Sequence, residues 1–384
     1  MKIVYVLPQF AVPAGTERIM TDKMNYLAED DNFEVIMLTN EQGAHPLAFP
    51  LSSKVKHIDL SVRYVNLYKE NWIVRFFKKF CYNRLYRKRF NSFIDIYRPD
   101  IVITSTYCDY IMAAIASSPY SFVRVLESHI DRRYIHINDP SKRKTLKTSL
   151  MSFFLMRSVS QKAKKFDLLV ALNEEDAMDW SKWIKTSVIQ DVVHLNPTGI
   201  YSDCSSNRVV FVGRYTEQKG VFDLIKIWQI VNRKYPNWRL DLYGNGNLRD
   251  VIIEKASSLN INIYVHKPDS FIFDRYIESS VILLTSLYEP FGLVMVEAMS
   301  CGVPVVAFDC PFGPNKIITD GVDGFLIKNR DIQLFADKLC ELIDSRELRS
   351  KMGKAGIKSS QRFSAEVVMP KWKSLFKELI ESKK

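Results

Sequence analysis

Residues 281–308 read VILLTSLYEPFGLVMVEAMSCGVPVVAF and contain the clearest structural pattern in the chain. The short apolar run Val281–Leu284 predicts a buried strand, and residues 304–308 predict a second one. The segment between them predicts a helix, which ends at Gly302. A strand, a helix and another strand in this order indicate a parallel sheet with helices on its faces.

The same alternation recurs along the whole chain, and helical stretches separate eleven predicted strands. These strands are residues 2–7, 34–38, 101–104, 122–126, 167–172, 208–212, 240–243, 261–265, 281–284, 304–308 and 324–327. A chain of 384 residues is too long for one ordinary core and suits two domains. We therefore predict an α/β protein with two doubly wound, Rossmann-like domains.

The predicted domain boundary lies in a stretch rich in turn-forming residues, 196–207, which we interpret as a linker. The N-terminal domain would then comprise residues 1–195, and the C-terminal domain residues 208–362. Residues 363–384 predict a separate amphipathic helix, because its apolar side chains fall on one stripe. The members of that stripe are Trp372, Leu375, Phe376 and Leu379.

The composition, with 47% hydrophobic and 25% charged residues, is typical of a soluble globular protein. No apolar run is long enough to span a bilayer, and the first residues lack the apolar core of a signal peptide. The six cysteines form neither a metal-type pair nor a disulfide framework, so we expect reduced thiols in a cytoplasmic protein. We expect no metal site, because no metal-ligating cluster and no Asp-x-Asp pair occurs.

The positive charge is concentrated in the first half, where residues 1–190 contain 28 Lys and Arg against 20 Asp and Glu. Residues 72–98 contain eight basic residues with aromatic residues between them, and a second basic stretch runs from Lys142 to Lys165. Two interpretations stay open for residues 72–98: a surface for anionic lipid headgroups, or a solvated helix with its aromatic side chains in the core. Nucleic acid is disfavoured, because no reader motif occurs. The cations of the lipid-binding or acceptor surface would be Arg75, Lys78, Lys79, Arg87, Lys88 and Arg89.

Two carboxylates lie around the start of the helix predicted after residues 281–284. Open α/β sheets bind ligands at the carboxyl ends of their strands, which is where Glu289 is expected. A helix that begins at Phe291 would direct its first free N–H groups towards the same edge and suit a phosphate. Those groups belong to Phe291, Gly292 and Leu293. Glu297 lies about 9 Å further along the helix, so the two carboxylates can contact opposite ends of an elongated anionic ligand.

Further candidate residues follow other predicted strands. Gly213 begins the loop after residues 208–212, and the same loop contains Arg214 and Lys219. Two cations in one strand-to-helix loop can hold a diphosphate, Arg214 through its planar fork and Lys219 as a point charge. Three other residues follow predicted strands and are expected at a carboxyl edge: Gly15, His129 and Gly244.

Taken in order, these motifs resemble the family 4 retaining glycosyltransferases, whose GT-B architecture has two Rossmann-like domains that face each other across a cleft. The resemblance covers nearly the whole chain and is strongest over residues 208–327. It implies an acceptor-binding N-terminal domain and a C-terminal domain that binds the nucleotide sugar. It also implies that the final helix packs back on the N-terminal domain.

The resemblance assigns a role to each candidate residue. Glu289 would hold hydroxyls of the donor sugar, Glu297 the ribose hydroxyls, and His129 would contact the sugar near the reacting carbon. Lys267 and its neighbours would lie against the base. The diphosphate would be held by Arg214, Lys219 and the N–H groups of Phe291, Gly292 and Leu293, beside the loops of Gly15, Gly213 and Gly244.

The implied reaction moves a hexosyl or N-acetylhexosaminyl group, with retention, from a nucleotide diphosphate sugar to a glycan or lipid-linked acceptor. We expect a UDP-sugar donor, no metal or other cofactor, and a role in the synthesis of cell-surface polysaccharide such as capsule or lipopolysaccharide. The protein would be cytoplasmic, and the lipid interpretation of residues 72–98 adds a peripheral position on the inner face of the cytoplasmic membrane. Two alternatives stay open: an epimerase of nucleotide diphosphate sugars, and a non-catalytic glycosyltransferase-like subunit.

Overall fold

The computed structural model describes residues 1–134 and 146–383. They form two compact units: residues 1–134, 146–192 and 365–383 in the first, and residues 193–364 in the second. The stretch interpreted as a linker, residues 196–207, thus lies within the second unit. Lys142 and Lys144, from the second basic stretch, lie outside the described residues. None of the described helices is both long and apolar enough to cross a membrane.

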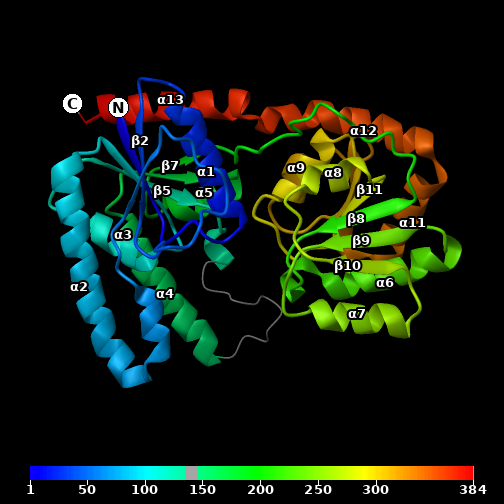
Figure 1. Cartoon of the computed structure of the whole chain (residues 1–384), viewed down its shortest axis with the longest axis horizontal. Coiled ribbons are helices and arrows are strands. Elements are labelled where there is room, and N and C mark those ends of the chain that lie inside the picture. Colours follow the sequence, from blue (N-terminus) through cyan, green and yellow to red (C-terminus); the bar gives the residue numbers. More distant parts are fainter. Residues whose placement is uncertain (135–145, 384) are drawn as a thin grey trace. The chain divides into compact units, whose positions relative to one another are not determined.

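The first unit contains a seven-stranded sheet in the order β3-β2-β1-β4-β5-β6-β7, and every neighbouring pair is parallel (Figure 1). Its strands are β1 (Lys2–Val6), β2 (Glu34–Thr39), β3 (Lys56–Asp59), β4 (Ile101–Ser105), β5 (Val123–Ser128), β6 (Leu168–Ala171) and β7 (Thr186–Val188). Its helices are α1 (Gly15–Ala28), α2 (Trp72–Tyr97), α3 (Asp109–Ala116), α4 (Leu146–Ala163), α5 (Glu174–Ser181) and α13 (Ala365–Glu381), with short 3₁₀ turns η1 (Tyr64–Lys69) and η2 (Arg132–Tyr134).

The C-terminal helix α13 belongs to this first unit and packs on α1. Trp372, Phe376 and Leu379 of its apolar stripe are buried, and Leu375 is half-buried. The buried ammonium of Lys23 lies over the Trp372 ring, 3.3 Å from the ring centroid. A second contact joins α13 to the turn after α1, because Lys373 Nζ donates to the carboxylate of Asp30 at 2.6 Å. A cation on a buried aromatic face is a stabilising contact, so α13 is an integral part of this unit.

The second unit contains a six-stranded parallel sheet in the order β10-β9-β8-β11-β12-β13 (Figure 1). Its strands are β8 (Arg208–Val212), β9 (Arg239–Tyr243), β10 (Ile263–His266), β11 (Val281–Leu284), β12 (Val305–Phe308) and β13 (Gly324–Ile327). Its helices are α6 (Val221–Lys234), α7 (Arg249–Ser258), α8 (Ile272–Ile277), α9 (Leu293–Ser300), α10 (Pro314–Ile317), α11 (Ile332–Asp344) and α12 (Arg346–Ser360), with 3₁₀ turns η3 (Glu217–Lys219), η4 (Lys328–Arg330) and η5 (Gln361–Phe363).

The period-two alternation of side chains builds the core of the second unit. Val209 and Phe211 of β8 and Leu240 and Leu242 of β9 point to one face, where they pack with buried residues of α6 and α11. Both sheets show the strand order of doubly wound folds, and the predicted α/β class with two such sheets is confirmed.

The two strands that the sequence did not predict are β3 and β7, at opposite edges of the first sheet. Both are short, and neither has a fully buried residue. Strand β3 reads Lys-His-Ile-Asp, so it lacks the apolar run that marks a central parallel strand.

Candidate functional site

The second sheet reverses its strand order between β8 and β11, which are hydrogen-bonded neighbours. In an open α/β sheet such a switch point leaves a crevice at the carboxyl ends of the two strands. The loop after β8 contains Gly213, Arg214 and Lys219, and the loop after β11 contains Glu289. The fold therefore places these predicted residues on the two sides of the switch point.

The two loops are joined by an ion pair and by hydrogen bonds. Lys219 Nζ lies 2.6 Å from Glu289 Oε2, and both side chains are largely buried, with exposed fractions of 14% and 10%. The hydroxyl of Ser286 donates to the same carboxylate oxygen at 2.9 Å. The Leu287 N–H donates to the Gln218 carbonyl at 2.7 Å. Lys219, the predicted phosphate cation, and Glu289, the predicted sugar carboxylate, thus form one paired unit.

The close approach of these loops requires a glycine at position 220. Gly220 has a left-handed backbone with φ +65°, and a Cβ atom there would lie 1.8 Å from the Thr285 carbonyl oxygen. The hydroxyl of Thr285 in turn donates to the Lys219 carbonyl at 2.9 Å. A larger residue would separate the loops and move Lys219 away from Glu289.

Arg214 adds a second positive charge at this edge of the sheet. Its side chain is exposed, and Nη2 donates to the amide oxygen of Gln218 at 3.0 Å. A guanidinium presents several donors in a fixed plane, which suits a phosphate. Arg214 is therefore available to an anionic ligand, in the same loop as Lys219, which is paired with Glu289.

The helix after Glu289 begins at Leu293, so the prediction that it begins at Phe291 is wrong by two residues. Gly292 precedes the helix with φ +104°, a left-handed conformation that cannot continue a right-handed helix. Phe291 is buried, and its ring meets Phe363 edge-on at 5.2 Å. The first N–H groups of the helix consequently belong to Leu293 and Val294, and Gly292 forms the turn before them.

Glu297 lies on α9, where the buried hydroxyl of Tyr276 donates to its Oε2 at 3.0 Å. Burial raises the pKa of Tyr276, and the neighbouring carboxylate raises it further. The hydroxyl therefore stays protonated and remains a donor. Tyr276, from α8, holds the orientation of Glu297, and the sequence analysis gave it no role.

Gly244 and Lys267 follow β9 and β10, so they extend the same carboxyl edge away from β8. A Cβ atom on Gly244 would lie 1.9 Å from the Gly213 carbonyl oxygen, so these two loops are also in close contact. The rings of Tyr243 and His266 stack at the ends of the two strands, 4.6 Å apart and inclined by 16°. Lys267 is exposed beside this stack.

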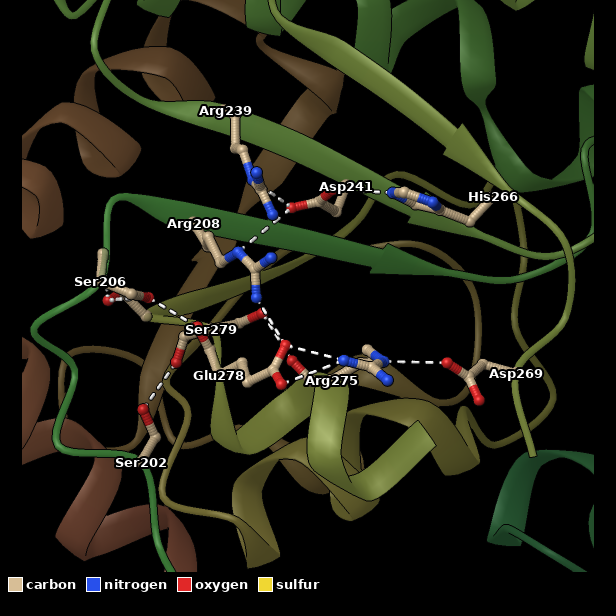
Figure 2. A network of polar contacts seen from close by, with 11 residues as sticks. Ser202, Ser206, Arg208, Arg239, Asp241, His266, Asp269, Arg275, Glu278 and Ser279 are labelled. Atoms are coloured by element: carbon tan, nitrogen blue, oxygen red, sulfur yellow. Dashed lines mark hydrogen bonds and ion pairs between the residues drawn. The ribbon is translucent and has the colours of Figure 1, made fainter. Parts of the chain in front are cut away.

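A polar network around the buried carboxylate of Asp241 fixes the ring of His266 (Figure 2). Asp241, in the middle of β9, lies 2.8 Å from His266 Nε2 and accepts from Arg239 Nε at 2.9 Å. Arg208 Nε lies 3.8 Å from the same carboxylate and its Nη1 donates to Glu278 at 2.5 Å. A buried carboxylate requires such partners, and here they link three neighbouring strands to the end of α8. The sequence analysis did not identify this network.

The first unit contains the two remaining predicted residues. Gly15 is the first residue of α1 and is exposed, and His129 lies just after β5 and is buried. His129 lies between two buried carboxylates, with Nε2 3.0 Å from Glu127 and Nδ1 3.6 Å from Asp191. Burial alone would lower the pKa of His129, but hydrogen bonds and charges from Asp191 and Glu127 outweigh it and raise the pKa to about 9. His129 is therefore an imidazolium at neutral pH.

The carboxylate beside His129 has a second buried partner. Lys23 Nζ lies 2.5 Å from Glu127 Oε1, and this lysine is 1% exposed. Burial would raise the pKa of Glu127, but the charge of Lys23 and the contacts of His129 lower it to about 2. Two cations and two carboxylates thus compensate each other in the interior. Asp191 could have been noticed in the sequence, because it is a single carboxylate in the mostly apolar stretch 188–193, but it was not predicted as a site residue.

The described residues contain no group of three or more His, Cys, Asp or Glu side chains that could hold a metal ion. Metal independence itself stays a prediction.

Residues 202–359 match the model of the family described as glycosyl transferases group 1. The chain is 33% identical over 171 residues to the amylovoran biosynthesis glycosyltransferase AmsD of Erwinia amylovora, covering 44% of this chain and 48% of that protein. It is 29% identical over 225 residues to the poly(ribitol-phosphate) α-N-acetylglucosaminyltransferase of Staphylococcus aureus, covering 57% of this chain and 43% of that protein. The chain thus spans about half the length of these relatives.

Solved structures share the fold over nearly the whole chain. TarM of S. aureus, solved in complex with fondaparinux, α-GlcNAc-glycerol and UDP, superimposes with a TM-score of 0.77 at 15% identity, over 98% of this chain and 99% of that chain. The sucrose-phosphate synthase of Thermosynechococcus elongatus superimposes with a TM-score of 0.79 at 18% identity, over 99% of each chain. These solved structures share the predicted architecture of two Rossmann-like domains, and the family match covers 158 of the 384 residues, all of them in the second unit.

Proposed function

We propose that the protein is a family 4 retaining glycosyltransferase that transfers a hexosyl or N-acetylhexosaminyl group from a UDP-sugar to a glycan or lipid-linked acceptor in cell-surface polysaccharide synthesis. The observation that carries this proposal is the Lys219–Glu289 pair at the switch point of the second sheet, beside Arg214. UDP in the TarM structure and the polysaccharide roles in the names of the relatives support the choice of donor and pathway class.

In this proposal the carboxyl edge of the second sheet binds the nucleotide sugar. Arg214 and Lys219 hold the diphosphate, together with the first N–H groups of α9. Glu297, oriented by Tyr276, binds the ribose hydroxyls, and the Tyr243–His266 stack beside Lys267 lies against the base. The loops of Gly213 and Gly244 bring the backbone close to the ligand.

The reaction develops negative charge on the departing diphosphate, which fixed cations stabilise. When phosphate oxygens approach Lys219, its ammonium is shared between them and Glu289, so the carboxylate is freed in part to accept hydrogen bonds from sugar hydroxyls. This exchange couples occupancy of the diphosphate site to the readiness of Glu289. Attack of the acceptor on the same face, assisted by the leaving phosphate, gives retention.

His129 completes the proposed catalytic residues from the first unit, where Gly15 begins α1. Because its ring is held as an imidazolium with one nitrogen facing Glu127 and the other facing Asp191, it acts as a positive charge near the sugar and not as a general base. The acceptor-binding role of the first unit, the absence of a required metal and the position at the inner face of the cytoplasmic membrane belong to the same proposal. The basic residues of α2 support the membrane position.

The test begins with the donor and needs no acceptor. A thermal-shift panel of nucleotide sugars should show a rise in melting temperature with UDP-sugars, since a ligand that binds only the folded state stabilises it by mass action. Slow release of UDP from the same sugar should fall by about a hundred-fold or more in Glu289→Gln, while UDP itself still binds. Glu254→Gln, on the exposed face of α7, is the matched control and should keep full activity.

The outcome also separates the alternatives. An epimerase would convert the UDP-sugar into its stereoisomer without releasing UDP, and a non-catalytic subunit would release none under any condition. Undiminished UDP release by Glu289→Gln would contradict the assigned role of that carboxylate.

A further inference from the structure

The first third of α2 exposes an unusual set of large apolar side chains. Five of them lie at the N-terminal end of the helix and are called the apolar tip: Trp72 (79% exposed), Ile73 (50%), Phe76 (73%), Phe77 (66%) and Phe80 (71%). Further along the same helix the pattern reverses, because Tyr86, Phe90, Phe93 and Ile94 are buried. The helix of 26 residues therefore extends beyond the core that covers its second half.

The apolar tip forms one continuous surface. At about 100° per residue its five side chains fall within an arc of about 140°, and they span about 12 Å along the axis. Three exposed cations, Arg84, Arg87 and Lys88, continue nearly the same arc between about 18 and 24 Å from Trp72. We call these three residues the basic collar. Along one side of α2, an apolar zone is thus followed by a positively charged zone.

Arg87 and Lys88 belong to the surface that the sequence predicted, Arg84 joins them, and the predicted Lys79 is exposed beside the apolar tip. The other three predicted cations have partners within the first unit. Arg75 donates to the carbonyls of Leu67 and Glu70, and Arg89 donates to those of Leu60 and Ser61. Lys78 pairs with the carboxylate of Glu70. These three side chains fasten α2 to its own unit, whereas the basic collar faces solvent.

A second helix of the first unit, α4, also exposes apolar side chains. Phe153, Phe154 and Leu155 of α4 are 60%, 60% and 40% exposed, and the two rings meet edge-to-face at 5.8 Å. In Figure 1 the N-terminal parts of α2 and α4 project in the same direction beyond the sheet of this unit. Phe153 and Phe154 lie near the middle of α4, so α2 carries exposed aromatic rings at its projecting end and α4 carries them along its length.

Two physical arguments identify what such a surface contacts. Exposed apolar patches of this extent on a globular protein mark an interaction site. Aromatic side chains beside cations suit the boundary of a lipid bilayer, where rings enter the acyl region and cations meet anionic headgroups. The order of the two zones along α2 matches the order of the two layers of a bilayer surface.

We propose that α2 enters the surface of an anionic lipid bilayer by its N-terminal end, with the apolar tip among the acyl chains, the basic collar at the headgroups, and Phe153 and Phe154 of α4 as a second contact. This deepens the membrane part of the proposed function by assigning the residues and the direction of entry. It does not depend on the donor or the reaction. A helix that lay flat on the surface would place cations on both flanks of the apolar stripe, whereas beside the apolar tip α2 has them on one side only, at Arg75, Lys78 and Lys79.

The test uses the full-length protein and vesicles of phosphatidylglycerol and phosphatidylcholine, with vesicles of phosphatidylcholine alone as reference. In flotation at about 0.1 M salt, the wild type should float with the anionic vesicles, and Phe76→Ser/Phe77→Ser/Phe80→Ser should lose at least ten-fold in partition. The collar variant Arg84→Gln/Arg87→Gln/Lys88→Gln should lose the dependence on phosphatidylglycerol and on salt. The fluorescence of Trp72, measured as the difference between wild type and Trp72→Tyr, should shift to shorter wavelength with anionic vesicles.

Matched controls keep the result decisive. Ile253→Ser/Leu259→Ser/Leu334→Ser changes three exposed apolar side chains of the second unit and should float as the wild type does. The altered tip side chains are exposed, so the melting temperature should remain unchanged. Failure of the wild type to float, or equal flotation of the tip variant, would overturn the proposal. If instead the tip variant converted a sedimenting dimer into a monomer without any effect on flotation, the surface would bind a second copy of the chain, and the lipid proposal would be wrong.

Discussion

The Lys219–Glu289 pair makes the sharpest energetic prediction. The change is Lys219→Met, which keeps most of the aliphatic stem and removes the ammonium 2.6 Å from the carboxylate. Among the described residues, Glu289 would then keep the hydroxyl of Ser286 as its side-chain partner, in a position that is 7% exposed. An uncompensated carboxylate in that environment should destabilise the second unit strongly.

The loss of stability expected for Lys219→Met lies between two limits. Removal of one partner of a fully buried pair costs about 3–5 kcal/mol, and an exposed pair contributes about 0–1 kcal/mol. Exposed fractions of 14% and 10% put this pair close to the buried limit, so we expect a loss of about 3 kcal/mol. In a unit of this size, that loss corresponds to a fall in melting temperature of about 6–12 °C.

A double-mutant cycle separates the pair from the packing of each side chain. Lys219→Met, Glu289→Gln and the double variant are compared by scanning calorimetry and urea unfolding of the full chain. Because Glu289→Gln removes the charge that Lys219→Met leaves unpaired, the double variant should be about 2 kcal/mol more stable than the sum of the single losses predicts. Additive losses, or a loss below about 1 kcal/mol for Lys219→Met, would refute the interpretation of the pair as a coupled buried unit.

The remaining predictions concern a titrating group, a backbone contact and an orienting hydroxyl. The pKa of His129 is raised from its usual 6.5 to about 9, so its contribution to stability is complete below pH 6.5 and is lost as pH rises through about 9. Between these two pH values the free energy of unfolding of the wild type should fall by up to about 3 kcal/mol, and that of His129→Gln should not show this fall. Urea unfolding at each pH measures both. Gly220→Ala should lower the melting temperature by several degrees, because the new Cβ atom would clash with the Thr285 carbonyl. Gly213→Ala, whose Cβ atom would have its nearest contact 3.5 Å away, should keep the wild-type melting temperature and bind UDP more weakly. Equal stability of the two variants would contradict the loop geometry. Tyr276→Phe should leave the fold intact and weaken UDP by about three- to ten-fold in calorimetric titration, because Glu297 loses its orienting donor, and no change would remove Tyr276 from the site.

The sequence alone predicted the central strands well. Strands such as Val281–Leu284 are buried on both faces, so they appear as short apolar runs, and their order along the chain predicts a parallel sheet. The edge strands β3 and β7 were missed because both are short, neither has a fully buried residue, and no apolar run marks them. The helix start after Glu289 was misassigned because a Pro before an apolar stretch is typical of a first turn, and the left-handed backbone of Gly292 is not visible in the sequence.

The strand ends were predictable, but the partners of the site residues were not. Lys219 and Glu289 each follow a buried strand, so a parallel sheet brings them to one edge. Tyr276 and Asp241 reach Glu297 and His266 only through the packing of α8 and the register of β9 against β10, which the local pattern does not encode.

The sequence also did not show which aromatic side chains of α2 are buried. These aromatic residues look alike along residues 72–90, and the sequence left open whether they lie in the core or on the surface. The structure shows both: Phe90 is fully buried, whereas Phe76, three to four turns earlier, is 73% exposed. The distinction depends on where the core ends relative to the helix, which is a property of the packed unit and not of the local pattern.

The central claim is that the carboxyl edge of the second sheet binds a nucleotide diphosphate through the cations of the loop after β8. Calorimetric titration of the full chain with UDP tests it most directly, with Arg214→Met beside Arg233→Met, an exposed arginine at the end of α6. The account predicts that the wild type and Arg233→Met bind UDP with equal affinity and that Arg214→Met binds it about ten- to a hundred-fold more weakly. An absence of UDP binding in the wild type, or equal affinity in all three proteins, would contradict it.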